Sequence, residues 1–153
     1  MRCNLQTRIR NGLNFSGLLR ERTEGARCVL CPRDWLPYKG KCYWVSKENR
    51  MWNSSHDDCL MKSSRLLVAR DQEEMDYIQT ITTEKNSLWI GLNFKSHERT
   101  WIWVDGAPFN GDLFPVVGPG ERNSCGVIKG KQIHSETCNA VVKWICEKEA
   151  LLV

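Results

Sequence analysis

The chain has 153 residues, which suffices for one domain with a sizeable core and a short additional segment but not for two full domains. Its net charge of +4 arises within residues 1–30, which contain six Arg and two Glu, because the rest of the chain has 16 basic and 16 acidic side chains. Nucleic-acid binding requires a basic face on the folded part of a protein, so this distribution argues against a nucleic-acid partner.

Eight cysteines in a chain of this length indicate an oxidising compartment and a set of disulfide bonds. The most apolar early run, residues 12–19, is interrupted by Asn14 and Ser16 and is far shorter than a membrane span, and no export signal is visible. We therefore expect an extracellular fragment, or a form that lacks the segment that would carry it across a membrane. A cytosolic protein with eight reduced thiols is the alternative.

Residues 1–30 are polar, rich in Arg and without a sustained hydrophobic period, which is typical of a flexible stalk or linker. All seven Trp lie between Trp35 and Trp144, so the core is expected in this later part of the chain. Residues 42–46 form a short apolar, aromatic run after a group of turn residues, which predicts a first strand.

Two helices are predicted next. Over residues 52–64, helical spacing places several side chains on one inner face. This face consists of Trp52, Ser55, Cys59, Leu60 and Ser63. The second helix begins at Asp71, where Glu74 three residues later forms a variant of the capping box. Apolar residues then recur at helical intervals, namely Met75, Ile78 and Ile81.

Strands surround a long loop in the second half of the chain. Residues 87–92 and 100–104 are rich in β-branched and aromatic side chains and are joined by a polar stretch, which predicts neighbouring strands. Residues 140–147 are predicted as the last strand. Residues 106–123 contain four Gly and three Pro without helical or strand period, and loops of this length in compact domains are commonly functional or mobile. The order of elements predicts an α+β domain.

Eight short motifs occur in a fixed order along the chain. They are Cys31-Pro-Arg-Asp-Trp-Leu, Lys41-Cys-Tyr-Trp, Trp52 with Cys59, Leu66-Leu-Val, Trp89-Ile-Gly-Leu, Trp101-Ile-Trp-Val-Asp-Gly, Asn123-Ser-Cys and Trp144-Ile-Cys-Glu. Together they resemble the C-type lectin-like domain over residues 31–148. The opening motif and the spacing are most similar to the killer cell lectin-like receptors of natural killer cells, subfamilies B and F.

This resemblance implies an α+β fold in which two helices pack on antiparallel sheets with a long loop region, stapled by disulfide bonds. It leaves residues 1–30 as the stalk and residues 149–153 as a C-terminal tail. It also implies a cell-surface location, in a type II membrane protein whose membrane span is absent from this sequence. The part described by the motifs would then be extracellular.

The resemblance further implies three disulfide bonds, Cys31–Cys42, Cys59–Cys146 and Cys125–Cys138, whereas sequence alone leaves the pairing open. Cys3 and Cys28 are left over. We expect Cys28, at the base of the stalk, to bridge two chains in a disulfide-linked homodimer. The alternative is an intramolecular bond between Cys28 and Cys3.

Sugar-binding members of the family hold calcium with a Glu-Pro-Asn or Gln-Pro-Asp triplet in the long loop and a Trp-Asn-Asp triplet before the fifth domain cysteine. Here the second triplet is Ile133-His134-Ser135, and the loop segment 118–125 offers Glu121 as its lone carboxylate. An imidazole is a poor ligand for so hard a cation, and a neutral hydroxyl does not replace the charge of a carboxylate. We therefore expect no metal and no cofactor.

The remaining scaffold suits the binding of another protein, and the resemblance implies a lectin-like or MHC-related cell-surface ligand bound without calcium. Arg and aromatic side chains are preferred interface anchors. The expected contacts are Phe109, Phe114, Arg122, Lys129, Lys131, His134 and Glu136. Each taken singly is also compatible with ordinary surface, and the two Phe with loop packing. The alternative function is a calcium-independent lectin that binds glycans through aromatic and hydroxyl groups; a soluble toxin-like lectin heterodimer is a third variant.

No catalytic motif is found, neither a nucleophile elbow nor a His-Glu-x-x-His zinc motif. His56 and Cys59 have the spacing of a zinc pair, but the implied disulfide already uses Cys59, so His56 is interpreted as a helix-surface residue. We therefore expect a protein that is not an enzyme. Asn14 and Asn53 each begin an N-glycosylation sequon.

Overall fold

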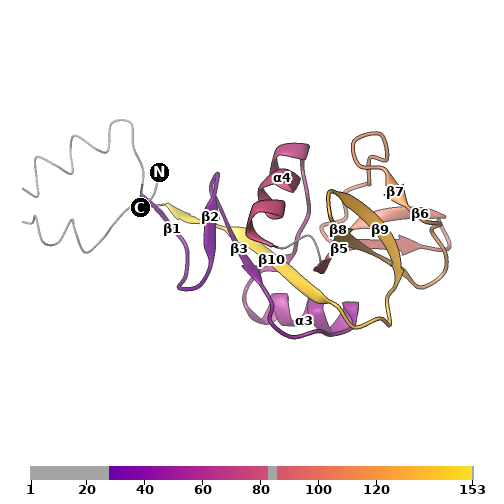
Figure 1. The fold of residues 1–153 in the computed structure, drawn as a ribbon, viewed down its shortest axis with the longest axis horizontal. Coiled ribbons are helices and arrows are strands. Elements are labelled where there is room, and N and C mark those ends of the chain that lie inside the picture. The colour runs from indigo at the N-terminus through magenta and orange to yellow at the C-terminus, as the bar shows by residue number, and fades with distance from the viewer. Residues whose placement is uncertain (1–27, 83–85, 153) are drawn as a thin grey trace, which may run out of the picture. The chain divides into compact units, whose positions relative to one another are not determined.

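The structure, a computed structural model, describes residues 28–82 and 86–152 (Figure 1). These residues belong to two compact units, a smaller one made of the segments up to Tyr43 and from Lys148 onward, and a larger one, Trp44–Glu147. The elements in chain order are β1 (Val29–Leu30), β2 (Leu36–Tyr38), β3 (Lys41–Val45), α3 (Trp52–Met61), β4 (Arg65–Leu66), α4 (Gln72–Ile81), β5 (Ser87–Lys95), β6 (Thr100–Trp103), β7 (Val116–Val117), β8 (Ser124–Lys129), β9 (Gln132–Thr137), β10 (Lys143–Glu149) and β11 (Leu151–Leu152).

In the smaller unit, β2 and β3 form an antiparallel hairpin closed by the two-residue turn Lys39-Gly40. Both turn residues have positive φ, 46° and 83°. This is the turn geometry that matches the twist of hairpin strands. The disulfide Cys31–Cys42 joins the segment before β2 to β3, as the resemblance implies.

The ends of the described chain differ from the boundaries expected from sequence. Val29 and Leu30 were placed in the stalk and residues 149–153 in a tail, but β1 pairs antiparallel with β11, Val29 opposite Leu152 and Leu30 opposite Leu151. Each two-residue strand supplies the backbone partners of the other, a long-range pairing that local composition does not predict. Residues 1–27 of the expected stalk, with Asn14 and Cys3, lie outside the described residues.

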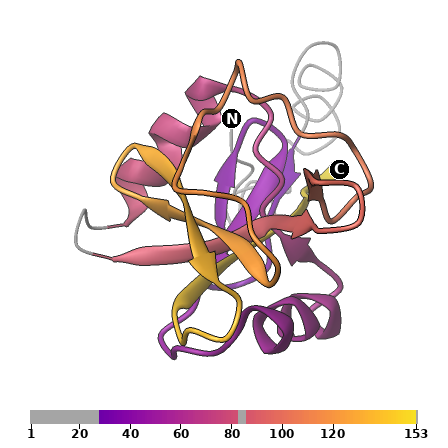
Figure 2. The ribbon, with the colours of Figure 1, turned by 90° about the vertical axis from the view of Figure 1, so that its right-hand side faces the viewer.

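The larger unit is built around β5. Three strands supply a large share of its buried core: Leu88, Trp89, Ile90 and Leu92 in β5, Val127 and Ile128 in β8, and Trp144, Ile145 and Cys146 in β10. A strand that is covered on both faces has a continuous apolar sequence rather than an alternating one. The helices α3 and α4 lie on opposite sides of β5 and β10 (Figure 1 and Figure 2).

The strand pairing is mixed, which corrects the expectation of antiparallel sheets. β5 pairs antiparallel with β6 and with β8, β8 with β9, and β4 with β10. β10 pairs parallel with β5, and β7 pairs parallel with β9. Parallel neighbours need a long connection between them, and β6 to β9 form the connection between β5 and β10. The predicted α+β fold with two helices is otherwise confirmed.

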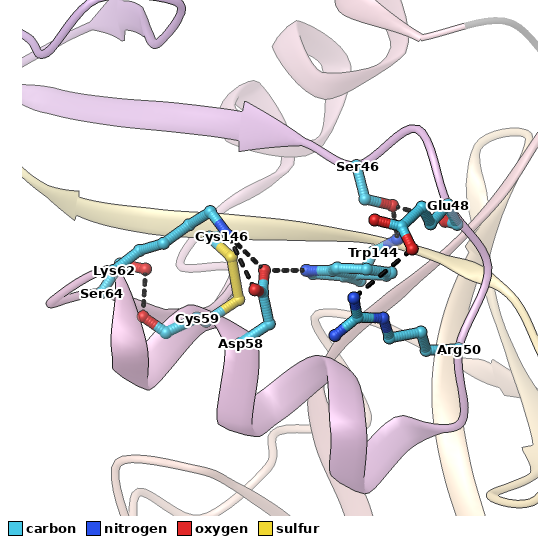
Figure 3. A network of polar contacts seen from close by, with 9 residues as sticks. All are labelled: Ser46, Glu48, Arg50, Asp58, Cys59, Lys62, Ser64, Trp144 and Cys146. Atoms are coloured by element: carbon cyan, nitrogen blue, oxygen red, sulfur yellow. Dashed lines mark hydrogen bonds and ion pairs between the residues drawn. A yellow bond between two sulfur atoms is a disulfide. The ribbon is translucent and has the colours of Figure 1, made fainter.

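The first helix is anchored to β10 by covalent and polar contacts (Figure 3). The disulfide Cys59–Cys146 links α3 to β10. The indole Nε1–H of Trp144 donates to Asp58 Oδ2 at 3.1 Å. Lys62 Nζ lies 2.7 Å from both carboxylate oxygens of Asp58. One carboxylate therefore satisfies an indole donor and an ammonium group beside the buried disulfide.

The inner face of α3 is shorter than predicted. Trp52, Ser55 and Cys59 are buried, but the Leu60 side chain is 54% exposed, so its assignment to the inner face was wrong. One residue step turns an α-helix by about 100°, which carries Leu60 away from the line through Cys59. The helix ends at Met61, before the predicted end.

The second helix begins as predicted. The Asp71 carboxylate accepts a hydrogen bond from the Glu74 backbone N–H at 2.8 Å, and Glu74 Oε1 accepts one from the Arg70 backbone N–H at 2.9 Å. This reciprocal arrangement confirms the capping-box variant, with the return arm reaching one residue before the N-cap. Met75 and Ile78 are buried on the inner face of α4.

Candidate functional site

The candidate site is built on the hairpin of β8 and β9, which pair along their whole lengths. Its turn contains Gly130, whose φ of 62° favours glycine. Gln79 of α4 donates a side-chain hydrogen bond to the Gly130 carbonyl. At the other end, the disulfide Cys125–Cys138 joins the start of β8 to the residue that follows β9. The hairpin is therefore fixed at both ends.

The long loop before β8 is attached to the outer side of this hairpin. Figure 2 shows the loop as the long orange trace between β6 and β8. Within it, β7 pairs in parallel with β9 opposite Ile133 and His134. Ser135 Oγ donates a hydrogen bond to the Pro119 carbonyl at 2.8 Å. A Cβ at Gly118 would lie 3.4 Å from the Ser135 Cβ, so the loop backbone passes close to β9.

These residues do not fit a calcium ion. The Ser135 hydroxyl contacts the loop backbone, and Glu136 Oε1 accepts a hydrogen bond from the Thr137 N–H at 3.0 Å. His134 supplies an imidazole, whereas calcium prefers oxygen ligands. In the loop segment 118–125, Glu121 is the lone carboxylate. Within residues 28–82 and 86–152, no three His, Cys, Asp or Glu side chains are grouped so as to hold a metal ion.

The structure does not bring all the expected contact residues together. Arg122 and Glu136 lie at the disulfide end of the hairpin, because Glu136 pairs with Cys125 and Arg122 comes just before β8. Lys129 and Lys131 lie at the turn end, which the strand geometry puts roughly 15–20 Å away at about 3.3 Å per residue. The two lysines and Arg122 are exposed, whereas Glu136 is half-buried. Half-buried His134 lies between the two ends, on β9.

The two aromatic candidates of the long loop differ in exposure. Phe114 is only 5% exposed, so its assignment as a contact residue is corrected: it packs in the interior. Burial of a large aromatic ring removes apolar surface from water and lowers the free energy of the folded state. Phe109 is half-buried, with its ring centroid 5.7 Å from that of Trp103. Phe109 therefore retains an accessible edge, while Phe114 supports the loop from inside.

Sequence reasoning missed a groove beside the disulfide end of the hairpin. Its volume is about 460 Å³. It is lined by Trp52 and Asn53 of α3, by residues 93–98 and Ile102 from the β5–β6 hairpin, and by residues 123–125 and Cys138. The sequence shows the polar stretch between two apolar strands, which forms part of the groove. No local pattern shows that α3 and the start of β8 lie beside this stretch.

Burial perturbs two titratable groups in the larger unit. It lowers the pKa of His56 below 6.5, an effect that the nearby Asp57 carboxylate partly opposes. The buried His56 Nδ1 has no hydrogen-bond partner in the part of the chain that the structure describes, and the ring stacks on Trp52 at 5.3 Å. Burial also raises the pKa of Tyr77 above 10.0.

Two further expectations concern residues outside the hairpin. Asn53 is exposed in the first turn of α3, so its side chain is accessible in the folded protein. Cys28 is disulfide-bonded. The structure holds one chain, so this bond is intramolecular and contradicts the bridge between two chains that is expected at Cys28. No helix among the described residues combines the length and the apolar character needed to cross a membrane.

Comparison with known proteins gives consistent relatives. The lectin C-type domain family matches residues 48–148. The chain is 50% identical over 119 residues to killer cell lectin-like receptor subfamily F member 1 of Homo sapiens, covering 78% of this chain and 52% of the relative. It is 39% identical over 132 residues to killer cell lectin-like receptor subfamily B member 1B allele B of Mus musculus, covering 85% and 59%. The chain thus spans little more than half the length of these relatives.

Solved structures share the fold. The C-type lectin domain of murine dendritic cell inhibitory receptor 2, in complex with N-glycan, is 25% identical and superposes with a TM-score of 0.72, covering 78% of this chain and 99% of that chain. A calcium-independent type II antifreeze protein is 23% identical, with a TM-score of 0.70 over 81% of this chain and 98% of that chain, and shows the fold alone. The chain belongs to the lectin C-type domain family and carries the domain of a killer cell lectin-like receptor, of the type found in subfamilies F and B.

Proposed function

We propose that the chain is the extracellular recognition domain of a cell-surface receptor of natural killer cells, anchored as a type II membrane protein, that binds a protein ligand without calcium. The ligand is a lectin-like or MHC-related cell-surface protein. The contact between Ser135 and Pro119 is the observation that supports binding without calcium. It joins the loop to β9 directly, where sugar-binding members of the family hold a metal ion.

The hairpin supports a protein ligand because it offers a rigid, polar and charged face. β7, Ser135 and the Cys125–Cys138 disulfide hold the surrounding backbone in place. A pre-organised surface loses less conformational entropy on binding. Arg122 and Glu136 at one end present charges of opposite sign, which fix the register of a partner and raise the association rate.

The proposed activity is recognition and not catalysis. The family is one of receptors and lectin-like domains, and none of the groups near the hairpin forms a nucleophile with an adjacent base among the hydrogen bonds of the described residues. The protein therefore needs no cofactor for this function. Its ligand would contact an area of standard interface size or less, about 800 Å² per partner.

Charge reversal at the two ends of the hairpin tests the proposal. Soluble domain labelled for detection is bound to ligand-bearing cells in excess chelator, and Arg122→Glu is compared with Lys129→Glu. Lys47→Glu, at an exposed site outside the hairpin, is the matched control. We expect binding to persist in chelator, to fall at least tenfold with one of the hairpin variants, and to be unchanged in the control. Binding that disappears with chelator, or that both hairpin variants leave intact, contradicts the proposal.

Calcium-independent glycan binding is the second candidate function. It is favoured by the polar groove beside the hairpin and by the family likeness to a lectin domain described with an N-glycan. Binding to a glycan array in the presence of chelator distinguishes the two functions. Retained binding to isolated glycans supports the lectin, whereas binding to the ligand-bearing cells that survives enzymatic removal of their glycans supports a protein ligand.

A further inference from the structure

The groove of about 460 Å³ has a wall of polar and apolar residues that the proposed protein-binding face does not use. Asn93 and Lys95 of β5 form one side, Asn123 forms the side before β8, and Asn53 forms the side at α3. The volume lies within the range of small-molecule sites, about 300–1,000 Å³. Its lining includes Cys125 and Cys138, so the groove borders the disulfide that closes this end of the hairpin.

The polar groups of this wall retain hydrogen-bonding capacity. The side chains of Asn53, Asn93, Lys95 and Glu98 make no hydrogen bond or ion pair with any other residue that the structure describes. Asn123 makes one long side-chain contact, from Nδ2 to Thr137 Oγ1 at 3.5 Å. A carboxamide both donates and accepts hydrogen bonds. The three carboxamides, of Asn53, Asn93 and Asn123, suit a ligand rich in hydroxyl and amide groups, which is the chemistry of an N-acetylated sugar.

Asn53 connects this wall to a source of such sugars. It is exposed, it lines the groove, and it begins the sequon Asn53-Ser54-Ser55. Because Asn53 itself lines the groove, a sugar attached to its Nδ2 atom lies at the groove from its first residue. The proposed occupant of the groove is therefore a sugar attached to this chain, and no separate binding partner is needed to supply it.

The third residue of the sequon determines when the sugar is attached. Ser55 is fully buried, and its Oγ donates to the Met51 carbonyl at 2.9 Å inside α3. An enzyme that must contact this hydroxyl has no access to it in the folded domain. Attachment at Asn53 therefore has to precede the folding of α3, whereas the attached sugar stays accessible because Asn53 remains exposed.

We propose that Asn53 carries an N-linked glycan whose first N-acetylglucosamine residues lie in this groove, against residues 93–98 and 123–125. In the attachment step, Asn53 Nδ2 forms a bond to C1 of the sugar, the bond from C1 to the diphosphate of a lipid-linked oligosaccharide breaks, the lipid diphosphate leaves, and the amide gives up one proton. The bound sugars cover the groove, including Cys125 and Cys138 in its lining. This inference does not depend on the proposed function.

Protein secreted from mammalian cells tests the proposal in two steps. Mass spectrometry of peptides first measures occupancy at Asn53, with Asn53→Gln as the control that lacks the acceptor. The glycoamidase that cleaves the bond between Asn and the first sugar is then applied to the native and to the denatured protein. We expect high occupancy and release from the native protein at least tenfold slower than from the denatured protein.

Slow release by itself shows only that the bond is shielded, so a second comparison locates the sugar. Hydrogen exchange of residues 93–98 and 123–125 is compared between the glycosylated protein and Asn53→Gln, and we expect slower exchange in the glycosylated protein in these segments alone. The variant Asn93→Ala, which alters the part of the lining that β5 provides, should restore rapid release. An unoccupied Asn53, equal exchange in both proteins, or release unaffected by Asn93→Ala overturns the proposal.

Discussion

The Ser135 hydroxyl donates a hydrogen bond to the carbonyl of Pro119, 2.8 Å away and 16 residues earlier in the sequence, and thereby joins β9 to the long loop. In a calcium-binding lectin the corresponding strand and loop would be held together through a metal ion, according to the family resemblance. Here a direct contact has that role, assisted by the parallel pairing of β7 with β9. Protein groups therefore join the loop to β9 directly.

Replacement of this hydroxyl should loosen the loop selectively. In Ser135→Ala, the loss of one neutral hydrogen bond at a half-buried site destabilises the domain by about 0.5–1.5 kcal/mol. Hydrogen exchange of residues 116–121 should become faster, while exchange of β5 and β10 stays unchanged. Equal acceleration throughout the domain would show that Ser135 supports the whole fold and not the loop.

The buried Glu147 carboxylate provides a second prediction. It is 1% exposed, its Oε2 accepts the Val68 N–H at 2.6 Å, and Arg65 Nε lies 3.4 Å from the same oxygen. Arg65→Ala removes a cation that lies beside this buried carboxylate, which should destabilise the domain by about 3–5 kcal/mol. Denaturant unfolding measures the change, and Arg70→Ala, at an exposed arginine, is the control. A loss in Arg65→Ala no larger than in the control would contradict the interpretation.

The disulfide between α3 and β10 should make a large contribution to stability. Cys59 and Cys146 are 87 residues apart. In the chain-entropy account, a cross-link over this separation stabilises the folded state by about 4–5 kcal/mol. The paired substitution of both cysteines by Ala should lower the midpoint of denaturant unfolding far more than paired replacement of Cys31 and Cys42, whose separation of 11 residues corresponds to about 3 kcal/mol. The reverse order would contradict this reasoning.

His56 should make stability depend on pH. Its pKa in the folded protein lies below the value of 6.5, chiefly because burial disfavours the charged ring. The unfolded chain then binds more protons between the folded pKa and about 6.5, so stability increases as the pH rises through this window. We expect the melting temperature to fall on acidification from pH 7. In His56→Phe, which retains an aromatic ring against Trp52, this part of the dependence should disappear; an unchanged pH profile would show that other groups cause it.

Local sequence signals predicted those parts of the fold that neighbouring residues determine. The cap at Asp71 depends on Glu74 three residues later, and the strand at Trp89 is a continuous apolar run, so both were found correctly. The assignment of Leu60 to the inner face was wrong because each residue turns an α-helix by about 100° and the buried face of α3 is narrow. The pairing of β1 with β11 was missed because its two strands are two residues long and more than 110 positions apart.

The candidate site was predicted less completely for the same reason. The residue types at His134 and Ser135 sufficed to argue against calcium, since ligand chemistry is local information. The separation of Arg122 from Lys129 follows from the register of β8, and the burial of Phe114 follows from the path of the loop. The groove at Asn53 requires three segments that are distant in sequence, so no single motif reveals it.

Calorimetric titration of calcium into chelator-treated, refolded domain tests the central claim most directly. Extracellular calcium modules bind with dissociation constants of about 10⁻⁴–10⁻³ M, so the titration should extend to roughly ten times the upper value. With Ser135 in contact with Pro119 and no carboxylate at residues 133–135, we expect no saturable heat and no change in melting temperature with calcium. Saturable binding of about one calcium ion per domain, abolished by Glu121→Gln, would contradict the account.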